Sequence, residues 1–120
     1  MDFILAPELK SDLKRIVESL GMFHVKSENI ITFRSFGSKS RAIARIWSLP
    51  RIWQMALKTS PHYCIEVVSE RFDRLPQAER EKVLIHELLH IPKNFSGALL
   101  PINKEPRELT AELSKKFIYS

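Results

Sequence analysis

The residues of this chain whose types and spacing could do chemistry lie in one short segment, His86-Glu87-Leu88-Leu89-His90. Residues four apart on an α-helix lie on the same face, one turn apart, so the two imidazoles can bind one Zn²⁺ ion at about 2.0–2.1 Å each. Glu87 can act as general base toward a metal-bound water and then donate the proton to a leaving amine. We therefore predict that His86 and His90 are metal ligands, that Zn²⁺ is the cofactor, and that Glu87 is the catalytic residue of a peptide-bond hydrolase.

The apolar flanks of this segment favour a metal site. Val83-Leu84-Ile85 precede the first histidine, and two leucines separate Glu87 from His90. A helix that is apolar on most sides is buried, and buried imidazoles or carboxylates cost free energy unless they have partners. A metal ion is one such partner. The alternative is a pair of hydrogen-bonded core histidines beside a surface glutamate.

The elements that would position these residues can be read from apolar periodicity and from the placement of proline and glycine. Helices are predicted over residues 7–20, 50–58, 76–91 and 106–117, and strands over residues 30–36, 41–48 and 63–68. We expect strand 41–48 to pair with strand 30–36. Strand 63–68 is expected to lie near the motif helix, where it could pair with an extended peptide substrate. Trp47 and Trp53 are predicted to belong to the core.

Length and composition limit the class of protein. A chain of 120 residues forms one domain, here 1–120, because two halves would each be too small to bury a core. No apolar run approaches the roughly 20 residues of a transmembrane helix, and no signal peptide is recognisable, so we expect a cytoplasmic protein without a membrane partner. The single cysteine, Cys64, excludes an internal disulfide and a cysteine cluster. The prediction is an α+β fold, with a short, mainly antiparallel sheet packed on the buried motif helix and flanking helices.

The positive charge of the chain is concentrated in its middle third. Residues 29–65 contain no Asp or Glu, and the net charge of +5 arises from their six cations, Arg34, Lys39, Arg41, Arg45, Arg51 and Lys58. Such a segment, interleaved with aromatic residues, could bind nucleic acid, with Arg41 and Arg45 as candidate contacts. The alternative is an ordinary solvated rim around the core.

The segment His86–Pro92, followed by Phe95-Ser96-Gly97, resembles the putative phage metallopeptidase family, a zincin-like group with phage, bacterial and archaeal members. Three further segments share this resemblance, which covers about residues 28–104: Ala42–Trp53, Tyr63–Val68 and Arg71–Leu75. The resemblance implies a small zinc-dependent peptidase that acts on peptide or protein substrates. It also assigns His86 and His90 as metal ligands and Glu87 as the acid/base.

The third metal ligand is the point at which this sequence departs from the family. The resemblance implies a further histidine shortly after Gly97, but no histidine follows His90 anywhere in the chain. Glu108 and Glu112, eighteen and twenty-two residues after His90, could complete the site, since some zinc hydrolases use a glutamate there. Otherwise the third ligand is lost, and the chain would be a catalytically degenerate scaffold that acts as a binding module, for example for nucleic acid through residues 29–65.

Overall fold

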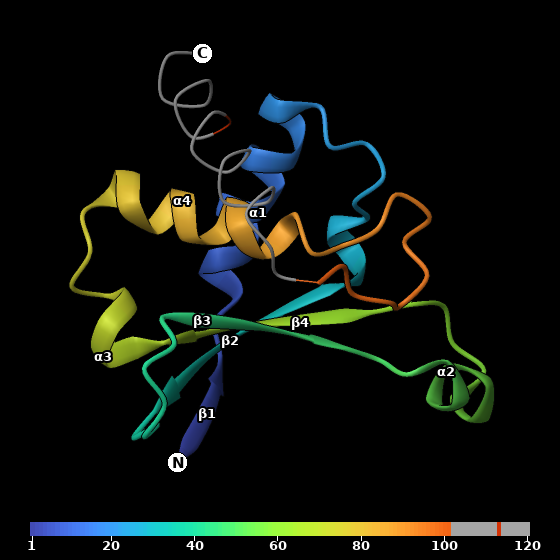
Figure 1. The fold of residues 1–120 in the computed structure, drawn as a ribbon, viewed down its shortest axis with the longest axis horizontal. Coiled ribbons are helices and arrows are strands. Elements are labelled where there is room, and N and C mark those ends of the chain that lie inside the picture. The colour runs from blue at the N-terminus through green and yellow to red at the C-terminus, as the bar shows by residue number, and fades with distance from the viewer. Residues whose placement is uncertain (102–112, 114–120) are drawn as a thin grey trace.

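The computed structural model describes residues 1–101 and Leu113, and it shows an α+β fold built on one four-stranded sheet (Figure 1). The sheet has the strand order β1-β2-β4-β3. In chain order the elements are β1 (Asp2–Leu5), α1 (Pro7–Leu20), the 3₁₀ turn η1 (Ser27–Asn29), β2 (Ile30–Phe36), β3 (Ala44–Ser48), α2 (Arg51–Leu57), β4 (Tyr63–Val68), α3 (Ser69–Phe72) and α4 (Gln77–Leu88). The helix expected over residues 106–117 lies outside the described residues, apart from Leu113.

The sheet is mixed. Strands β1 and β2 pair antiparallel, β3 and β4 pair antiparallel, and the central pair of β2 and β4 is parallel. The expectation of a mainly antiparallel sheet therefore holds for the two outer pairs only. The strand β1 was not predicted, because a run of four residues before Pro7 has no periodicity to read.

The predicted pairing of β3 with β2 is wrong, because β4 lies between these two strands. Five of the six residues of β4 are buried, whereas β3 has no buried residue. A strand that is apolar on both faces requires a neighbour on each side and cover on its faces, and an interior position supplies these better than an edge does. The more polar β3, with Arg45 among its residues, tolerates the edge of the sheet.

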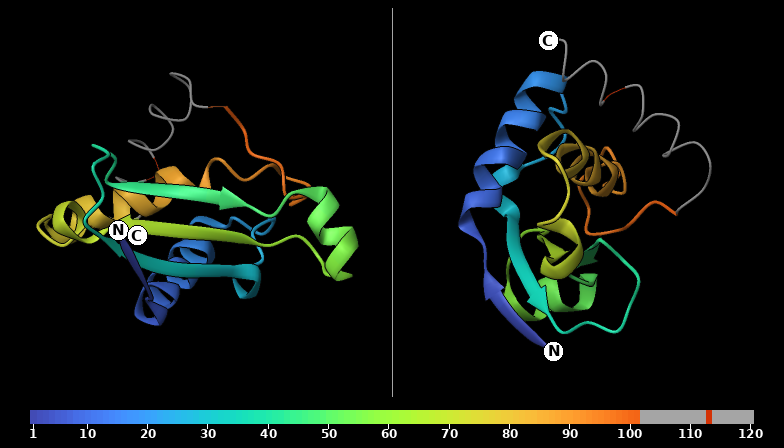
Figure 2. Two further views of the ribbon diagram at one scale, coloured as in Figure 1. Left: turned by 90° about the horizontal axis from the view of Figure 1, so that it is seen from below. Right: turned by 90° about the vertical axis from the view of Figure 1, so that its left-hand side faces the viewer.

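The helices α1 and α4 cover one face of the sheet and enclose the core with it (Figures 1 and 2). The apolar stripe predicted for residues 7–20 is confirmed, since one face of α1 is buried and its C-terminus is capped by Gly21 at φ 65°. Strand β4 faces these helices with Tyr63, Ile65 and Val67, each at most 1% exposed. Helix α4 contributes Leu84, Ile85 and Leu88 to the same core.

The opposite face of the sheet is not covered by any described helix, as the view from below shows (Figure 2, left). Trp47 on this side of β3 is 50% exposed, and Trp53 on α2 is 55% exposed. The prediction that both tryptophans belong to the core is therefore wrong, because no element of the described residues packs as a second layer on this part of the sheet. None of the helices in the part of the chain that the structure describes has the length and apolar character needed to cross a bilayer.

Candidate metal centre

Helix α4 positions the predicted chemical residues. It begins after Pro76, as predicted, but ends at Leu88 rather than at Ile91. The chain then continues in a tighter turn, in which the His90 amide donates to the Glu87 carbonyl at 3.1 Å. The imidazoles of His86 and His90 still come together, with ring centroids 5.0 Å apart and ring planes at 84°. The one-turn spacing of the motif therefore survives the early end of the helix.

His86, Glu87 and His90 form a group that could hold a metal ion. One ligand atom from each residue, an imidazole nitrogen or a carboxylate oxygen, lies within 4.8 Å of the others. Glu87 and His90 are buried, and His86 is partly exposed. Two imidazoles and a carboxylate are the donor atoms that borderline-soft cations such as Zn²⁺ prefer.

A hydrogen bond of the His90 side chain orients its ring for ligand binding. The Nδ1 atom lies 2.9 Å from the carbonyl oxygen of Leu100, and the Leu100 amide donates back to the His90 carbonyl at 2.7 Å. Because a carbonyl can only accept, Nδ1 carries the proton and Nε2 keeps its lone pair. Nε2 is buried and has no hydrogen-bond partner among the described residues. A buried nitrogen with an unused lone pair, beside a second imidazole, fits a metal ion.

Glu87 has the environment of a proton carrier. Its side chain is only 7% exposed. Burial raises the pKa of the Glu87 carboxyl, and the neighbouring His90 partly opposes this shift. A raised carboxyl pKa makes the group a stronger base than a solvated glutamate at neutral pH. The side chain can therefore both accept and return a proton.

A cleft of about 580 Å³ joins this group to strand β3. Glu87 and His90 line the cleft together with Ala44 and Ile46 of β3 and with Leu100. The outer edge of β3 has no strand partner in residues 1–101, so its backbone groups beside the cleft can accept an added strand. The expectation that strand 63–68 would bind a peptide is wrong, because both edges of β4 are already paired.

The loop after His90 is anchored by side chains that sequence analysis did not assign to the site. The Tyr63 hydroxyl accepts a hydrogen bond from the Gly97 amide at 2.9 Å and donates to the Ala98 carbonyl at 2.8 Å. The Gln54 amide nitrogen donates to the Ser96 carbonyl at 3.2 Å and to that of Leu49 at 2.8 Å. This loop carries Leu100 to His90, so Tyr63 and Gln54 indirectly position the His90 side chain, a candidate metal ligand. No local sequence pattern identifies Tyr63 and Gln54, because the loop residues to which they bond lie 34 to 42 residues away.

Replacement of Gly97 by alanine is expected to destabilise this loop. Gly97 has a φ of +92°, and a Cβ there would lie 2.2 Å from the Gln54 amide nitrogen and 3.0 Å from the Leu49 carbonyl oxygen. We expect Gly97→Ala to lower the free energy of unfolding by about 1–3 kcal/mol and to weaken zinc binding by roughly 10–100-fold. Urea denaturation and chelator competition measure the two effects.

Gly37→Ala is the matched control for this prediction. Gly37 also has a positive φ, +77°, but a Cβ there would meet nothing nearer than 3.9 Å. Gly37→Ala would therefore introduce the same kind of backbone strain as Gly97→Ala without the steric conflict. Equal losses of stability in the two variants would show that the steric conflict between a Cβ at position 97 and Gln54 does not contribute to the loss.

The two remaining histidines and the candidate nucleic-acid contacts Arg41 and Arg45 lie outside this group. His62 bonds the Ser60 carbonyl through Nδ1 at 2.7 Å, and neither it nor His24 belongs to the metal-ligating group. Arg41 is exposed. Arg45 donates to the Ser38 hydroxyl at 2.7 Å and lies 3.5 Å from the Glu66 carboxylate. The candidate third ligands Glu108 and Glu112 lie outside the described residues.

A group of two histidines and a glutamate, largely buried and with ligand atoms close enough to share one ion, is typical of a metal-dependent enzyme. The model of the family described as "Putative phage metallopeptidase" matches residues 1–115, and the chain belongs to this family. The resemblance seen in the motif and its flanks is thereby confirmed. No curated protein and no solved structure matches the chain.

Proposed function

We propose that this protein is a zinc-dependent peptidase with a zincin-type mechanism. The observation that supports it best is a cleft lined on one side by Glu87 and His90 of the candidate metal group. Its other side is the edge strand β3, whose outer edge has no strand partner in residues 1–101. Family membership supports the same class of reaction. The cleft therefore brings a potential metal site to the place where an extended peptide can add to the sheet.

His86 and His90 would hold the zinc ion through their imidazoles, and we propose Glu108 as the third protein ligand, with Glu112 as its alternative. Bound zinc would polarise the scissile carbonyl and lower the pKa of water toward about 7. The hydrogen bond from His90 Nδ1 to Leu100 fixes the tautomer and the ring orientation that this role requires.

Glu87 would carry the proton during the reaction. Its carboxylate accepts a proton from the attacking water as the new carbon–oxygen bond forms. It then donates this proton to the amide nitrogen as the carbon–nitrogen bond breaks, which gives a carboxylic acid and an amine. The second proton of the water then passes from the acid to the amine, so that the products are a carboxylate and an ammonium group. Burial raises the pKa of the Glu87 carboxyl, which makes its carboxylate a better proton acceptor than that of a solvated glutamate.

Removal and return of the metal tests this proposal. We expect the purified protein to contain about one zinc ion per chain and to cleave an unfolded protein such as casein. Treatment with a chelator should abolish cleavage, and one equivalent of Zn²⁺ should restore it. Stoichiometric zinc without any cleavage of unfolded proteins or peptide mixtures would favour the alternative, a degenerate scaffold that only binds.

A further inference from the structure

We propose that the uncovered face of the sheet next to α2 is a docking site for a protein substrate, in particular for an apolar segment flanked by acidic residues. This inference rests on the proposed peptidase function, because it assigns the surface to substrate rather than to another partner. We call the surface the α2 groove and define it by Ile31, Trp47, Trp53, Leu57 and Cys64.

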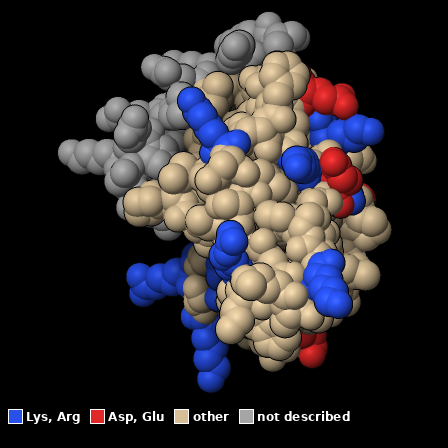
Figure 3. Space-filling model, turned by 90° about the vertical axis from the view of Figure 1, so that its right-hand side faces the viewer, with Lys and Arg blue, Asp and Glu red and all other residues tan. Residues whose placement is uncertain are grey.

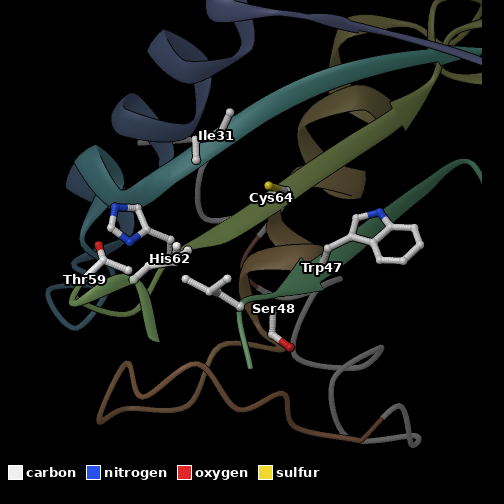
Figure 4. Close-up of a pocket in the computed structure, with 8 residues that line it drawn as sticks. Ile31, Trp47, Ser48, Thr59, His62 and Cys64 are labelled. Carbon is white, nitrogen blue, oxygen red and sulfur yellow. The ribbon is translucent and has the colours of Figure 1, made fainter. Parts of the chain in front are cut away.

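The floor of the α2 groove is apolar and hollowed. A hollow of about 350 Å³ lies between the sheet and the C-terminal end of α2, lined by Ile31, Trp47, Leu57 and Cys64 among others (Figure 4). A second hollow of about 470 Å³ shares Trp47 and Cys64 with the first and extends to Phe3 and Phe33. Two adjoining hollows of this size can receive large apolar side chains of a bound segment.

Helix α2 forms one wall of the groove and is unusual for a soluble protein. None of its seven residues is buried, and its large apolar side chains are between 55% and 75% exposed. Trp53 and Leu57 are four residues apart and therefore share one face of the helix. Leu57 lines the first hollow, and exposed Trp53 lies one turn before it on the same face of α2. An exposed apolar surface of this kind marks an interaction site.

The orientation of Trp47 is fixed before any ligand binds. Its indole Nε1 donates to the Glu66 carboxylate at 2.9 Å, and Glu66 is only 1% exposed. The second carboxylate oxygen of Glu66 lies 3.5 Å from the Arg45 guanidinium, which balances the buried charge. A rigid aromatic side chain loses little conformational entropy on binding and is a frequent anchor of protein interfaces.

The charge around the groove is positive. Exposed Arg51 and Lys58 stand at the two ends of α2, and the segment 29–65 contains no carboxylate. Arg34 and Arg45 of this segment are already paired with carboxylates, so the charge next to α2 comes from Arg51 and Lys58. Figure 3, which faces the α2 end of the molecule, shows Lys and Arg side chains across this end and Asp and Glu mainly toward one margin. Acidic residues beside an apolar segment would complement this charge and speed encounter.

Other occupants fit these observations less well. A second copy of the chain would bring two positive surfaces together. Binding to a lipid bilayer would require an exposed apolar surface but not the two hollows. A nucleic acid would meet an almost wholly apolar floor, and Arg45, one of its candidate contacts, is already engaged by Ser38 and Glu66.

The groove also adjoins the candidate active site. Trp47 lines both hollows of the groove and the cleft that contains Glu87 and His90. Gln54 of α2 bonds the loop that leads from His90 to Leu100. A substrate segment bound in the groove would therefore lie next to a second segment of the same substrate that is added as a strand at β3. We infer that the groove selects substrates by residues outside the scissile bond.

Peptide binding to the Glu87→Gln protein tests the inference without turnover. Two fluorescein-labelled peptides share the same apolar centre and differ in flanking residues, four Glu in one and four Lys in the other. By fluorescence anisotropy, we expect the Glu-flanked peptide to bind at least tenfold more tightly at low salt. Trp53→Ala and Leu57→Ala, each introduced into the Glu87→Gln protein, should weaken binding of the Glu-flanked peptide roughly 5–50-fold. Phe23→Ala is the control, since Phe23 is an 89% exposed aromatic outside the groove, and it should change nothing.

Several results would overturn the inference: equal affinity for the two peptides, unchanged binding in both groove variants, or equal loss in Phe23→Ala. Binding of phosphatidylglycerol vesicles or of a single-stranded oligonucleotide that depends on Trp53, without peptide binding, would assign the surface to a bilayer or to nucleic acid instead. Failure of the peptidase proposal is distinguishable. In that case the Glu-flanked peptide still binds, but the zinc-loaded native protein does not cleave it.

Discussion

Replacement of Glu87 by glutamine is expected to abolish peptide hydrolysis while about one zinc ion per chain stays bound. Glutamine keeps the size of the side chain but cannot accept or return a proton. Loss of a general acid–base group lowers the rate by roughly 10²–10⁴-fold or more. The two imidazoles that would hold the metal are untouched. Cleavage of a fluorogenic peptide and elemental analysis of the same preparation measure the two quantities.

The control for this experiment is Glu79→Gln, which removes an exposed carboxylate from the same helix. It should retain both the metal and the full rate. If Glu87→Gln lost the metal as completely as a histidine variant, Glu87 would be a ligand rather than a base. This outcome is the alternative to a general base, because the ligand atoms of all three residues lie within 4.8 Å of one another.

Removal of either histidine is expected to abolish zinc binding. One imidazole and a carboxylate cannot hold zinc as two imidazoles do, and the loss of affinity should exceed the roughly 10–100-fold that removal of an outer partner costs. His90→Ala also removes the hydrogen-bond donor to the Leu100 carbonyl, so it should lower the stability of the metal-free protein as well. Chelator competition measures affinity, and urea denaturation of the metal-free proteins measures stability.

His24→Ala is the control, because His24 does not belong to the metal-ligating group of the described residues. Metal retained in the His86→Ala/His90→Ala double variant would refute the assignment. The same titration of Glu108→Ala and Glu112→Ala identifies the third ligand, since only the variant of a true ligand should lose tenfold or more in affinity. Unchanged affinity in both would favour a two-histidine site and the non-enzymatic alternative.

The sequence alone determined the features that depend on short spacing. His86 and His90 come together because four residues make about one helical turn, and this holds although α4 ends at Leu88. The buried face of α1 follows from apolar residues three and four apart. Strand β4 follows from a run of apolar and β-branched residues. Each of these predictions needs only the geometry of one element.

Only the tertiary structure decided which elements are neighbours and which faces are covered. Periodicity predicts a strand but not its partners, so the insertion of β4 between β2 and β3, and with it the free edge of β3 at the cleft, could not be read from the sequence. The hydrogen bond from His90 to Leu100 depends on a loop anchored by Tyr63 and Gln54 across long sequence separations. Trp47 and Trp53 are exposed because no element within residues 1–101 packs on their side of the sheet. The burial of an apolar residue depends on such a layer rather than on the residue's own type.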